Sequence, residues 1–369
     1  MKILFLSNSI GGLINFRFEL MERLCQRGDK VIVSSSIEAS PKRLEDIGCR
    51  IIPMEMSQRG TNPIGEYRLL KNYERLLKQE RPDVVLAYTI KPNIYGSVAC
   101  RNRHIPIIAN VTGLGTAIEN GGIMQKITMG LYKWGFKETD FVYFQNQESM
   151  DFFKRYRVNP KAQSLIAGSG VNMERFAYSE YPNSNKGIHF LFISRILPQK
   201  GIQQYLDVAE AIRLKCKEVY FHIVGIKDDP YYSNLIEEKA KEGVIIYHGQ
   251  QTDVRPFIAQ CHCLVHPSFY PEGLSNVCLE SSAMGRPVIT TDKSGCREVV
   301  ADGMTGFIVK QQDTSDLLEK VERFIALPHE QKKEMGYQAH EKVKKEFNRT
   351  NVVREYIEKI DQMVNQYGK

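Results

Sequence analysis

Short runs of β-branched and aromatic residues alternate with longer amphipathic segments along most of this chain, and this alternation limits the possible folds most strongly. Strands that alternate with helices form parallel sheets covered by helices on both faces. In the first half, helical patterns near 15–27, 41–47 and 63–81 separate the apolar runs KILFLS (2–7), KVIVSSS (30–36), CRIIPM (49–54), DVVLAY (83–88) and PIIANV (106–111).

The alternation starts again after the polar segment YSEYPNSNKG (178–187), which has the composition of a linker. The strand-like runs there are HFLFIS (189–194), VYFHIVG (219–225), VIIYHG (244–249), CLVHPS (263–268) and PVITT (287–291). Helices are predicted near 200–215, 230–242, 275–284, 294–302 and over most of 313–366. We therefore predict an α/β protein with two Rossmann-like, doubly wound domains facing a central cleft, at 1–175 and 185–348, and a helix at about 350–369 that packs back on the first domain.

The composition is globular, with 42% hydrophobic and 25% charged residues, and the formal charge of +7 suits an anionic ligand or an acidic membrane surface. We find no nucleic-acid-binding signature. No apolar stretch reaches the length of a membrane span, and the N-terminal run ILFL is too short for a signal peptide. The eight cysteines are scattered and form no CxxC. These features predict a cytoplasmic protein.

Two loops that follow predicted strands have the residues of anion sites. SNSIGG (7–12) places paired glycines between a strand and a helix, where backbone amides can approach an anion. It lacks the GxGxxG of dinucleotide sites, and a tight turn without a ligand is the alternative. SRILPQKG (194–201) places Arg195 and Lys200 where a basic pair can hold a diphosphate, although such residues are common in loops.

The stretch PEGLSNVCLE (271–280) carries two acids in a run with little other charge. Ser275 is a plausible N-cap, so a short helix would point its free amides at the loop that holds Glu272. A phosphate docked on those amides, with Glu272 against a sugar hydroxyl and Glu280 against a ribose, explains the pattern. The alternative is that Glu272 caps the helix electrostatically and Glu280 is merely exposed.

Two further segments allow more than one interpretation. CHCLVHP (261–267) invites a zinc site, but buried thiols on an alternating strand explain it, and nothing implies an obligatory metal. Residues 121–140 carry apolar side chains at helical spacing among lysines 126, 133 and 137. Such a helix could lie on a membrane surface, or it could pack its apolar face on its own sheet. The apolar positions are Ile123, Met124, Ile127, Leu131 and Trp134.

EGLSNVCLE resembles the E-x7-E motif of retaining glycosyltransferases of family 4, which have the GT-B fold. Other segments of the second domain are similar to this family as well: GSGVNMERF (168–176), SRILPQKG (194–201), HGQQTDV (248–254) and SGCREVVADGMTGFIV (294–309). In the first domain, AYTIKPNIYGSVACR (87–101) and VTGLGTA (111–117) resemble transferases of bacterial capsule, O-antigen and lipid-linked oligosaccharide assembly.

The resemblance implies roles for individual residues at a donor site. Arg195 and Lys200 would neutralise the leaving diphosphate, and Glu272 would contact hydroxyls of the transferred sugar; these three form the implied catalytic set. Glu280 would hold the ribose. The other implied donor-binding positions act through backbone groups near the phosphates, the sugar or the base, and they are Gly12, Gly249, Gln250, Gly273, Leu274 and Ser275.

One departure from the family affects the acceptor side. Many relatives have a histidine after the fifth strand of the first domain, where this chain reads Asn110-Val111-Thr112-Gly113. No histidine role is therefore carried over, and Asn110 and Thr112 are the acceptor-side candidates.

The resemblance implies transfer of a sugar, an N-acetylhexosamine or a hexose, from a nucleoside diphosphate sugar, UDP-linked by expectation, with retention and without an obligatory cofactor. The implied acceptor is a polyprenyl-diphosphate-linked saccharide, so the protein would work at the inner face of the plasma membrane, with residues 121–140 as the contact. Two alternatives stay open: a UDP-sugar 2-epimerase of the same architecture, and a non-catalytic nucleotide-sugar-binding protein.

Overall fold

The computed structural model describes residues 1–56, 62–119 and 121–367, which divide into two compact units. Unit 1 comprises Met1–Ser169 and Thr350–Lys369, and unit 2 comprises Gly170–Arg349. The first unit thus ends a few residues before the predicted boundary at 175. The reason is local pairing: the Val171 amide donates to Phe347 O (2.8 Å), and the Arg349 amide donates to Val171 O (3.0 Å). The predicted C-terminal helix extends to 369, but positions 368–369 lie outside the described residues.

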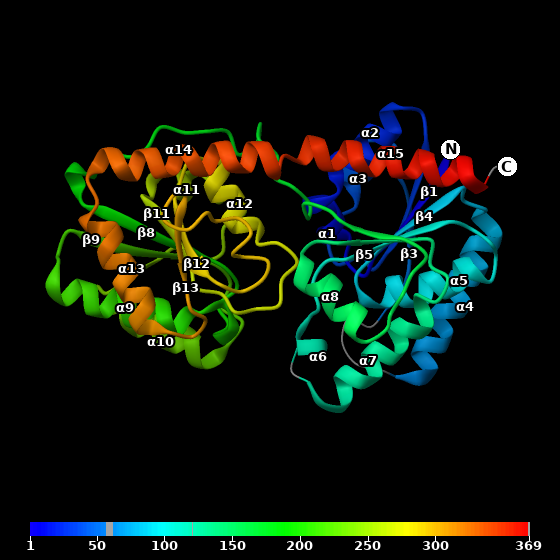
Figure 1. The fold of residues 1–369 in the computed structure, drawn as a ribbon, viewed down its shortest axis with the longest axis horizontal. Coiled ribbons are helices and arrows are strands. Elements are labelled where there is room, and N and C mark those ends of the chain that lie inside the picture. Colours follow the sequence, from blue (N-terminus) through cyan, green and yellow to red (C-terminus); the bar gives the residue numbers. More distant parts are fainter. Residues whose placement is uncertain (57–61, 120, 368–369) are drawn as a thin grey trace. The chain divides into compact units, whose positions relative to one another are not determined.

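Among its described residues, unit 1 contains a parallel sheet of seven strands in the order β3-β2-β1-β4-β5-β6-β7 (Figure 1). Leu4 of β1 lies between Ile32 of β2 and Val85 of β4. The strands are β1 (Lys2–Leu6), β2 (Lys30–Ser35), β3 (Arg50–Pro53), β4 (Val84–Tyr88), β5 (Ile107–Val111), β6 (Phe141–Phe144) and β7 (Gln163–Leu165).

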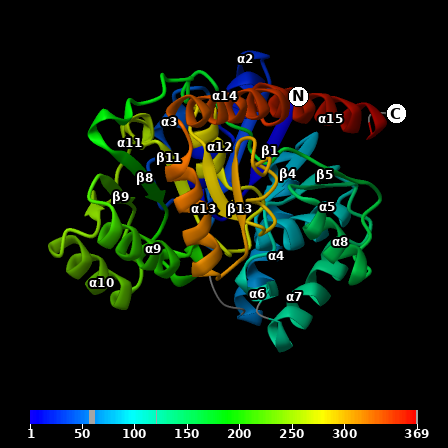
Figure 2. The ribbon, with the colours of Figure 1, turned by 60° about the vertical axis from the view of Figure 1, so that its left-hand side comes forward.

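Successive side chains of each central strand of unit 1 enter different cores, because strand side chains alternate between the faces of a sheet. Leu4 and Leu6 join a cluster with α4 (Pro63–Glu80), a π-helical turn (Pro92–Gly96), α5 (Ser97–Arg101), α7 (Gly122–Gly135) and α8 (Gln147–Arg155). Ile3 and Phe5 join the other cluster, with α1 (Ile10–Phe16), α2 (Phe18–Gln26), α3 (Lys42–Glu45) and α15 (Arg349–Tyr367). The short helix α6 (Thr116–Glu119) precedes α7. Figure 2 shows these layers from a second side.

A buried arginine interrupts the single helix predicted at 15–27. Arg17 separates α1 from α2, with φ −135° and ψ 5°. Its guanidinium carbon lies 5.0 Å from the centroid of the Tyr88 ring and 5.4 Å from that of Tyr356 on α15. A guanidinium over two aromatic faces gains cation–π attraction. Arg17 therefore helps to hold α15 on unit 1.

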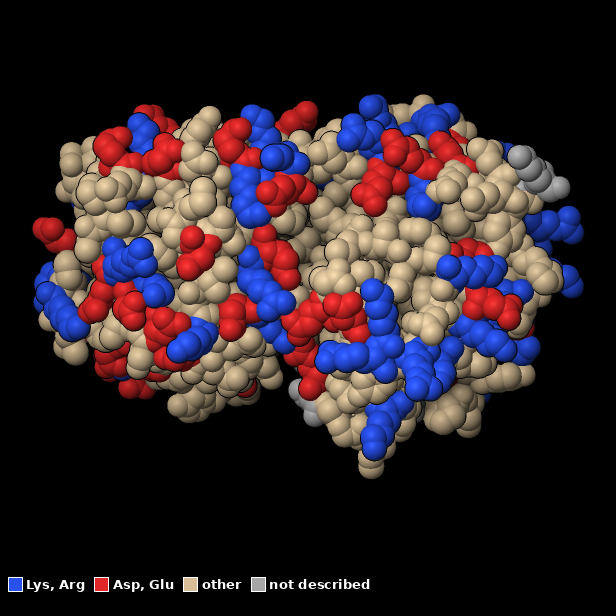
Figure 3. Space-filling view, in the orientation of Figure 1, with Lys and Arg blue, Asp and Glu red and all other residues tan. Residues whose placement is uncertain are grey.

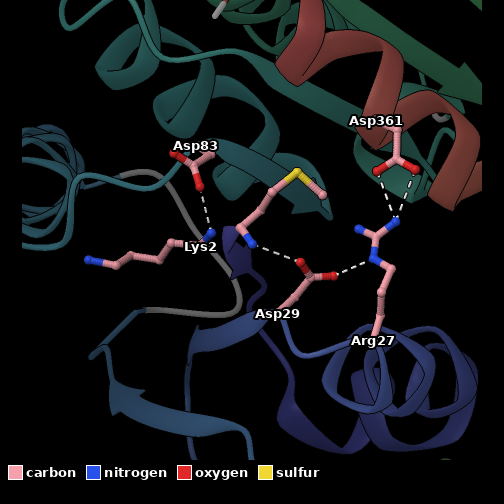
Figure 4. A network of polar contacts seen from close by, with 6 residues as sticks. Lys2, Arg27, Asp29, Asp83 and Asp361 are labelled. Atoms are coloured by element: carbon pink, nitrogen blue, oxygen red, sulfur yellow. Dashed lines mark hydrogen bonds and ion pairs between the residues drawn. The ribbon is translucent and has the colours of Figure 1, made fainter.

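A polar network on unit 1 also includes α15 (Figure 4). Arg27 donates to both carboxylate oxygens of Asp361 (2.9 and 3.0 Å) and to Asp29 (2.6 Å). Asp29 also accepts from the amino group of Met1 (2.8 Å), and Asp83 accepts from the Lys2 amide (2.7 Å). The carboxylates thus join β1, α2 and α15.

Unit 2 contains, over its described length of 170–349, a parallel sheet of six strands in the order β10-β9-β8-β11-β12-β13. The strands are β8 (Ile188–Ile193), β9 (Val219–Val224), β10 (Ile246–Tyr247), β11 (Cys263–His266), β12 (Val288–Thr291) and β13 (Gly306–Val309). One face is covered by α9 (Ile202–Lys215), α10 (Pro230–Lys241) and α13 (Thr314–Ala326), and the other by α11 (Arg255–Gln260), α12 (Asn276–Ala283) and α14 (His329–Glu346) (Figure 1).

Two kinds of prediction about local structure were wrong. Strands β6 (FVYF), β7 (QSL) and β13 (GFIV) were missed, because runs of three or four residues are too short to show the period of a strand. The helix predicted near 294–302 is a series of turns. There the Gly295 amide donates to the Glu298 carboxylate (2.6 Å), and the Gly295 carbonyl accepts from the Ser275 amide (2.7 Å). The backbone of 295 is thus bonded to the loop before α12.

Candidate functional site

The loops that carry the predicted catalytic residues follow neighbouring strands of unit 2. Because β8 and β11 pair in parallel, their carboxyl ends lie at the same edge of the sheet. The two loops are bonded to each other, since the Phe269 amide donates to Gln199 O (2.9 Å). Gly201, at φ +76°, approaches so closely that a Cβ there would lie 2.1 Å from Pro267 O. A glycine is therefore required at 201 to bring Lys200 against the second loop.

Lys200 lies at the centre of this edge. It is 8% exposed, its ammonium forms an ion pair with the Glu272 carboxylate, and its Nζ lies 4.5 Å from the centroid of the Tyr270 ring. Burial, with a smaller contribution from the positive charge of Arg195, lowers the pKa of Lys200 to about 8. The ammonium is thus desolvated, held in place and still mostly charged at neutral pH.

Arg195 lies on the solvent side of the same group. Its guanidinium carbon is 5.9 Å from the centroid of the Tyr270 ring, and its Nη1 is 3.4 Å from a carboxylate oxygen of Asp228. Tyr270 therefore contacts both predicted cations. The sequence reasoning missed Tyr270 and Asp228; for Tyr270, a signal was its position two residues before Glu272.

The helix of the E-x7-E motif begins at this edge. Ser275 is the N-cap of α12, but its side chain makes no capping hydrogen bond. Its amide is not available as predicted, because it donates to Gly295 O. Gly273 and Leu274 are buried in the preceding loop. The start of α12 keeps its positive dipole end beside Glu272, with fewer donors for a phosphate than expected.

Glu280 lies about one turn into α12 and is partly buried. Burial raises the pKa of its carboxyl to about 7, against the opposing effect of the positive charges of Arg349 and Arg175. A carboxyl group in this state can ionise when a ligand supplies hydroxyl donors. The predicted pair is thus chemically unequal: Glu272 is paired with a cation, and Glu280 is poised near neutral pH.

The predicted base-contacting residues follow β10 at the same edge of the sheet. The Gly249 carbonyl accepts from the Gly225 amide (2.9 Å), which fixes the loop against the end of β9. Gln250 is exposed. The backbone of this loop is therefore anchored while the Gln250 side chain faces solvent.

Gly12 lies in unit 1, in the first turn of α1. Its amide donates to the hydroxyl of the N-cap Ser9 (2.9 Å). The Glu38 carboxylate accepts from the amides of Ile10 (3.2 Å) and Gly11 (3.0 Å) and from the Ser9 hydroxyl. Burial opposes ionisation, yet these donors hold the pKa of Glu38 below its usual value. The predicted anion site at SNSIGG is occupied by the protein's own carboxylate, which the sequence reasoning missed.

The two acceptor-side candidates differ in their surroundings. Asn110 is buried. Its side-chain nitrogen Nδ2 donates to Ala87 O (3.0 Å), and its side-chain oxygen Oδ1 accepts from the Tyr356 hydroxyl. These bonds join α15 to β4 and β5, and the acceptor-side role of Asn110 stays a prediction. Thr112 follows β5 and is exposed, so it stays a candidate.

The described residues include no group of three or more histidine, cysteine or acidic side chains that could hold a metal ion. At the segment that invited a zinc site, the Cys261 and Cys263 thiols donate to the carbonyls of Ile258 (3.3 Å) and Leu264 (3.4 Å).

Comparison with known families assigns both halves of the chain. Residues 174–342 match the family described as glycosyl transferases group 1, and residues 2–146 match the family described as glycosyl transferase 4-like. The second match covers most of the sheet of unit 1, and the first covers nearly all of unit 2.

Curated relatives from bacteria carry related descriptions. The chain is 28% identical over 342 residues to the N,N'-diacetylbacillosaminyl-diphospho-undecaprenol alpha-1,3-N-acetylgalactosaminyltransferase of Campylobacter jejuni, covering 87% of this chain and 88% of the relative. It is 25% identical over 288 residues to the UDP-Gal:alpha-D-GlcNAc-diphosphoundecaprenol alpha-1,3-galactosyltransferase of Escherichia coli, covering 72% of each.

Solved structures show the same fold. Anabaena Alr3699/HepE, crystallised with UDP and glucose, matches with a TM-score of 0.80 at 18% identity, over 98% of this chain and 99% of the other. A glycosyltransferase from Rickettsia africae matches with a TM-score of 0.80 at 18% identity, over 98% of each chain. These neighbours have the GT-B fold, which confirms the predicted fold class.

Proposed function

Because the chain belongs to the glycosyltransferases that join a 4-like domain to a group 1 domain, we propose that it transfers a sugar from a UDP-sugar to a hydroxyl of a polyprenyl-diphosphate-linked saccharide, with retention. Two relatives are named for acceptors linked to diphospho-undecaprenol, and one of them is named for a UDP-sugar donor. The transferred sugar is an N-acetylhexosamine or a hexose, as in those names. The product belongs to bacterial surface polysaccharide or glycan assembly.

The observation that carries the proposal is the grouping of Lys200, Arg195 and Tyr270 beside the start of α12. As the bond to the sugar breaks, negative charge develops on the departing diphosphate. Two preorganised cations stabilise that charge more in the transition state than in the ground state. The Tyr270 ring restricts where both cations can lie, so little reorganisation is needed during the reaction.

Glu272 has a second role in this mechanism, because it neutralises Lys200 before a donor binds. When the diphosphate arrives, it competes with Glu272 for the Lys200 ammonium. The released carboxylate can then accept hydrogen bonds from the sugar. Glu280 takes the ribose hydroxyls, and the backbone at 249–250 lies against the base. The predicted contact of Gly12 with the donor phosphates stays a prediction, and it requires the Gly12 amide to exchange the Ser9 hydroxyl for a phosphate.

The direct test is turnover with purified protein, a panel of UDP-sugars and a synthetic polyprenyl-diphosphate saccharide. The proposal predicts acceptor-dependent UDP release and an α-linked product from an α-linked donor. A new sugar nucleotide formed without acceptor would instead identify the 2-epimerase. Binding of UDP-sugar without release of UDP, with the wild type and Glu272→Ala alike, would identify a non-catalytic binding protein.

We also propose that α7 brings unit 1 to an anionic membrane surface. The helix packs on its sheet through Met129 and Tyr132, whereas four of the five apolar positions named from the sequence point outward. Their exposed fractions are 78% for Ile123, 45% for Met124, 46% for Ile127 and 42% for Trp134. Lys126, Lys133 and Lys137 are exposed beside them.

Charge supports this placement of α7. Figure 3 shows lysine and arginine side chains gathered on the part of unit 1 where Figure 1 places α7 and α8. The end of α8 adds Lys154 and Arg155, and the Tyr156 hydroxyl donates to Gln125 of α7 (2.8 Å). Apolar side chains flanked by cations suit the boundary of an anionic bilayer. No described helix is long and apolar enough to cross a membrane.

Flotation with liposomes that contain anionic lipid tests this surface. Each basic residue near such a surface contributes about 1 kcal/mol, so changing lysines 126, 133 and 137 to glutamate should abolish flotation. A matched control changes three exposed lysines of unit 2, 310, 333 and 345, to glutamate and should float as the wild type does. Equal flotation of the two triple variants would contradict the α7 surface.

A further inference from the structure

Four of the eight histidines in the sequence stand side by side across unit 2, and we call them the histidine ladder: His262, His189, His222 and His248. The centroids of successive rings are 5.8, 5.1 and 5.2 Å apart, and their planes differ by 14°, 24° and 15°. His189 Nδ1 lies 2.9 Å from His222 Nε2, and His222 Nδ1 lies 2.9 Å from His248 Nε2. The backbone amide of His189 donates to His262 Nδ1 (3.1 Å).

The ladder crosses the sheet diagonally and ends at the candidate site. His189 and His222 lie on β8 and β9, His262 directly precedes β11, and His248 directly follows β10. Ile246 of β10 lies beside His222, so His248 is two residues nearer the carboxyl edge. It immediately precedes Gly249 and Gln250, the residues assigned to the base.

Hydrogen bonding makes the protons of the ladder interdependent. A neutral imidazole has one donor and one acceptor nitrogen, and His222 is bonded through both. If His222 donates to His248, it must accept from His189, and the reverse order is equally consistent. A second proton on His222 would make both of its nitrogens donors, so both neighbouring rings would have to accept and one of them would change its tautomer.

The surroundings of the ladder favour neutral rings. Burial lowers the pKa of His222 and of His262 to about 4 and shifts those of His189 and His248 downward. The positive charges of Lys332 and Arg286 also lower the pKa of His262. The Tyr181 ring packs perpendicular to the His262 ring. The Tyr220 ring, which Arg213 also contacts, stacks on His189. Burial lowers the pKa of His189 more than its hydrogen bond with the Lys186 backbone raises it.

We propose that His222 is a positioning residue, which fixes the ring of His248 and thereby the loop at 248–250 against the base of a nucleoside diphosphate. The His248 ring lies between two fixed groups, with His222 bonded at Nε2 and the Phe257 ring 4.9 Å away. The next residues follow directly from that ring, and the Gln251 side chain donates to His248 O (2.6 Å). This inference rests on the proposed function, because the loop must meet a nucleotide.

Two amide substitutions separate positioning from packing. Asparagine places a polar atom where His222 has Nδ1, and glutamine places one where it has Nε2. His222→Asn therefore keeps the bond to His248, whereas His222→Gln keeps only the bond to His189. We expect the UDP Kd, measured by calorimetry at pH 7.5, to rise about 10-fold in His222→Gln and to change less than about 3-fold in His222→Asn. A 10-fold change corresponds to about 1.4 kcal/mol, near the upper end of the range for one neutral hydrogen bond.

The control is Tyr220→Phe, which keeps the ring stacked on His189 and should leave the UDP Kd unchanged. Equal losses in the two His222 variants would overturn the inference and leave a packing role. A wild type that binds no nucleoside diphosphate would contradict the proposed function and the positioning role together. If UDP binds with the same Kd to the wild type and to all the variants, the positioning role of His222 is overturned while the proposed function stands.

A measurement on the wild type guards against a variant that fails to fold. In the free protein, NMR of the uniformly ¹⁵N-labelled chain should show His222 with one protonated and one accepting nitrogen at pH 7.5. As the pH falls from 7.5 toward 4.5, the Gly249 amide signal should shift together with the ladder rings. Titration of the rings without movement of the Gly249 signal would overturn the inference.

Discussion

In unit 1, the first helix after β1 begins on a carboxylate of the same unit: Glu38 accepts two α1 amides and the Ser9 hydroxyl. In unit 2, the corresponding edge presents cations. Lys200 and Arg195 flank Tyr270, and α12 begins without a side-chain cap. Both edges are the carboxyl ends of parallel strands, so topology alone does not decide which edge attracts an anion.

The ligand preference of a doubly wound sheet is therefore set by which backbone amides and which side-chain charges its own loops already pair. The unit 1 edge supplies its own negative charge and has no unmet need for a phosphate. The unit 2 edge holds a desolvated ammonium that the Glu272 carboxylate neutralises. Bare nucleoside diphosphate should therefore bind unit 2, with unit 1 left to the acceptor.

The largest expected effect is on Lys200. Lys200→Met keeps the length of the side chain and removes the charge, so kcat should fall about 100- to 1,000-fold, as when one preorganised electrostatic group is lost. The matched control is Lys332→Met, since Lys332 is also buried but donates to the carbonyls of Ile325 and Leu327 (2.9 and 2.7 Å). That change should lower the melting temperature but leave kcat of the folded protein intact. Equal kcat in the two variants would exclude the electrostatic role of Lys200 at the edge of unit 2.

A pH effect of about 10-fold is expected from Glu280. With a pKa of about 7, about one carboxyl in ten is ionised at pH 6, so the ionisation of Glu280 taken alone should raise the UDP affinity about 10-fold between pH 6 and pH 8. Affinity should fall again as Lys200 loses its proton above about pH 8. Calorimetry across this range should show a maximum between the two values. Glu280→Gln should remove the acidic limb and leave the alkaline one, and an unchanged acidic limb would exclude Glu280 from the nucleotide site.

The raised pKa of Glu280 should also affect the stability of the fold. Its folded pKa lies above the unfolded value of 4.5, so the folded state binds the proton more tightly. That contribution is present below pH 4.5 and is lost as the pH rises through about 7. Glu280→Gln should therefore unfold at a higher temperature than the wild type at pH 8. A lower melting temperature at pH 8 would show that the ionised carboxylate is stabilised by its two arginine neighbours.

The smallest effect is expected at Glu38. Glu38→Gln replaces the carboxylate at the start of α1 with a neutral amide. Losing a negative charge at a helix N-terminus typically lowers the free energy of unfolding by at most about 1 kcal/mol. Because the folded pKa is lowered, the difference should be present above pH 4.5 and vanish as the pH falls below it. Urea unfolding at pH 7 and pH 3.5 measures it, and UDP affinity should not change. A gain in UDP affinity would mean that Glu38 competes with the nucleotide.

The sequence predicted the fold class and the loops of the site because both depend on local patterns. Apolar periodicity marked most strands, and the E-x7-E spacing placed Glu272 and Glu280 on a loop and a helix. The partners could not be predicted, since they depend on strand order and register. Glu38 reaches α1 across 27 residues from Gly11, and Asn110 meets Tyr356 across 246. The histidine ladder needs four strands in register, which no spacing along the chain reveals.

Hydrogen exchange with and without bare UDP tests the central claim, that the carboxyl edge of unit 2 binds the nucleoside diphosphate. The account predicts slower exchange in peptides that cover 195–201, 248–250 and 270–280, and unchanged exchange in those that cover 9–16 and 38. Protection confined to the peptides of unit 1, or absent from all three segments of unit 2 at saturating UDP, would contradict it.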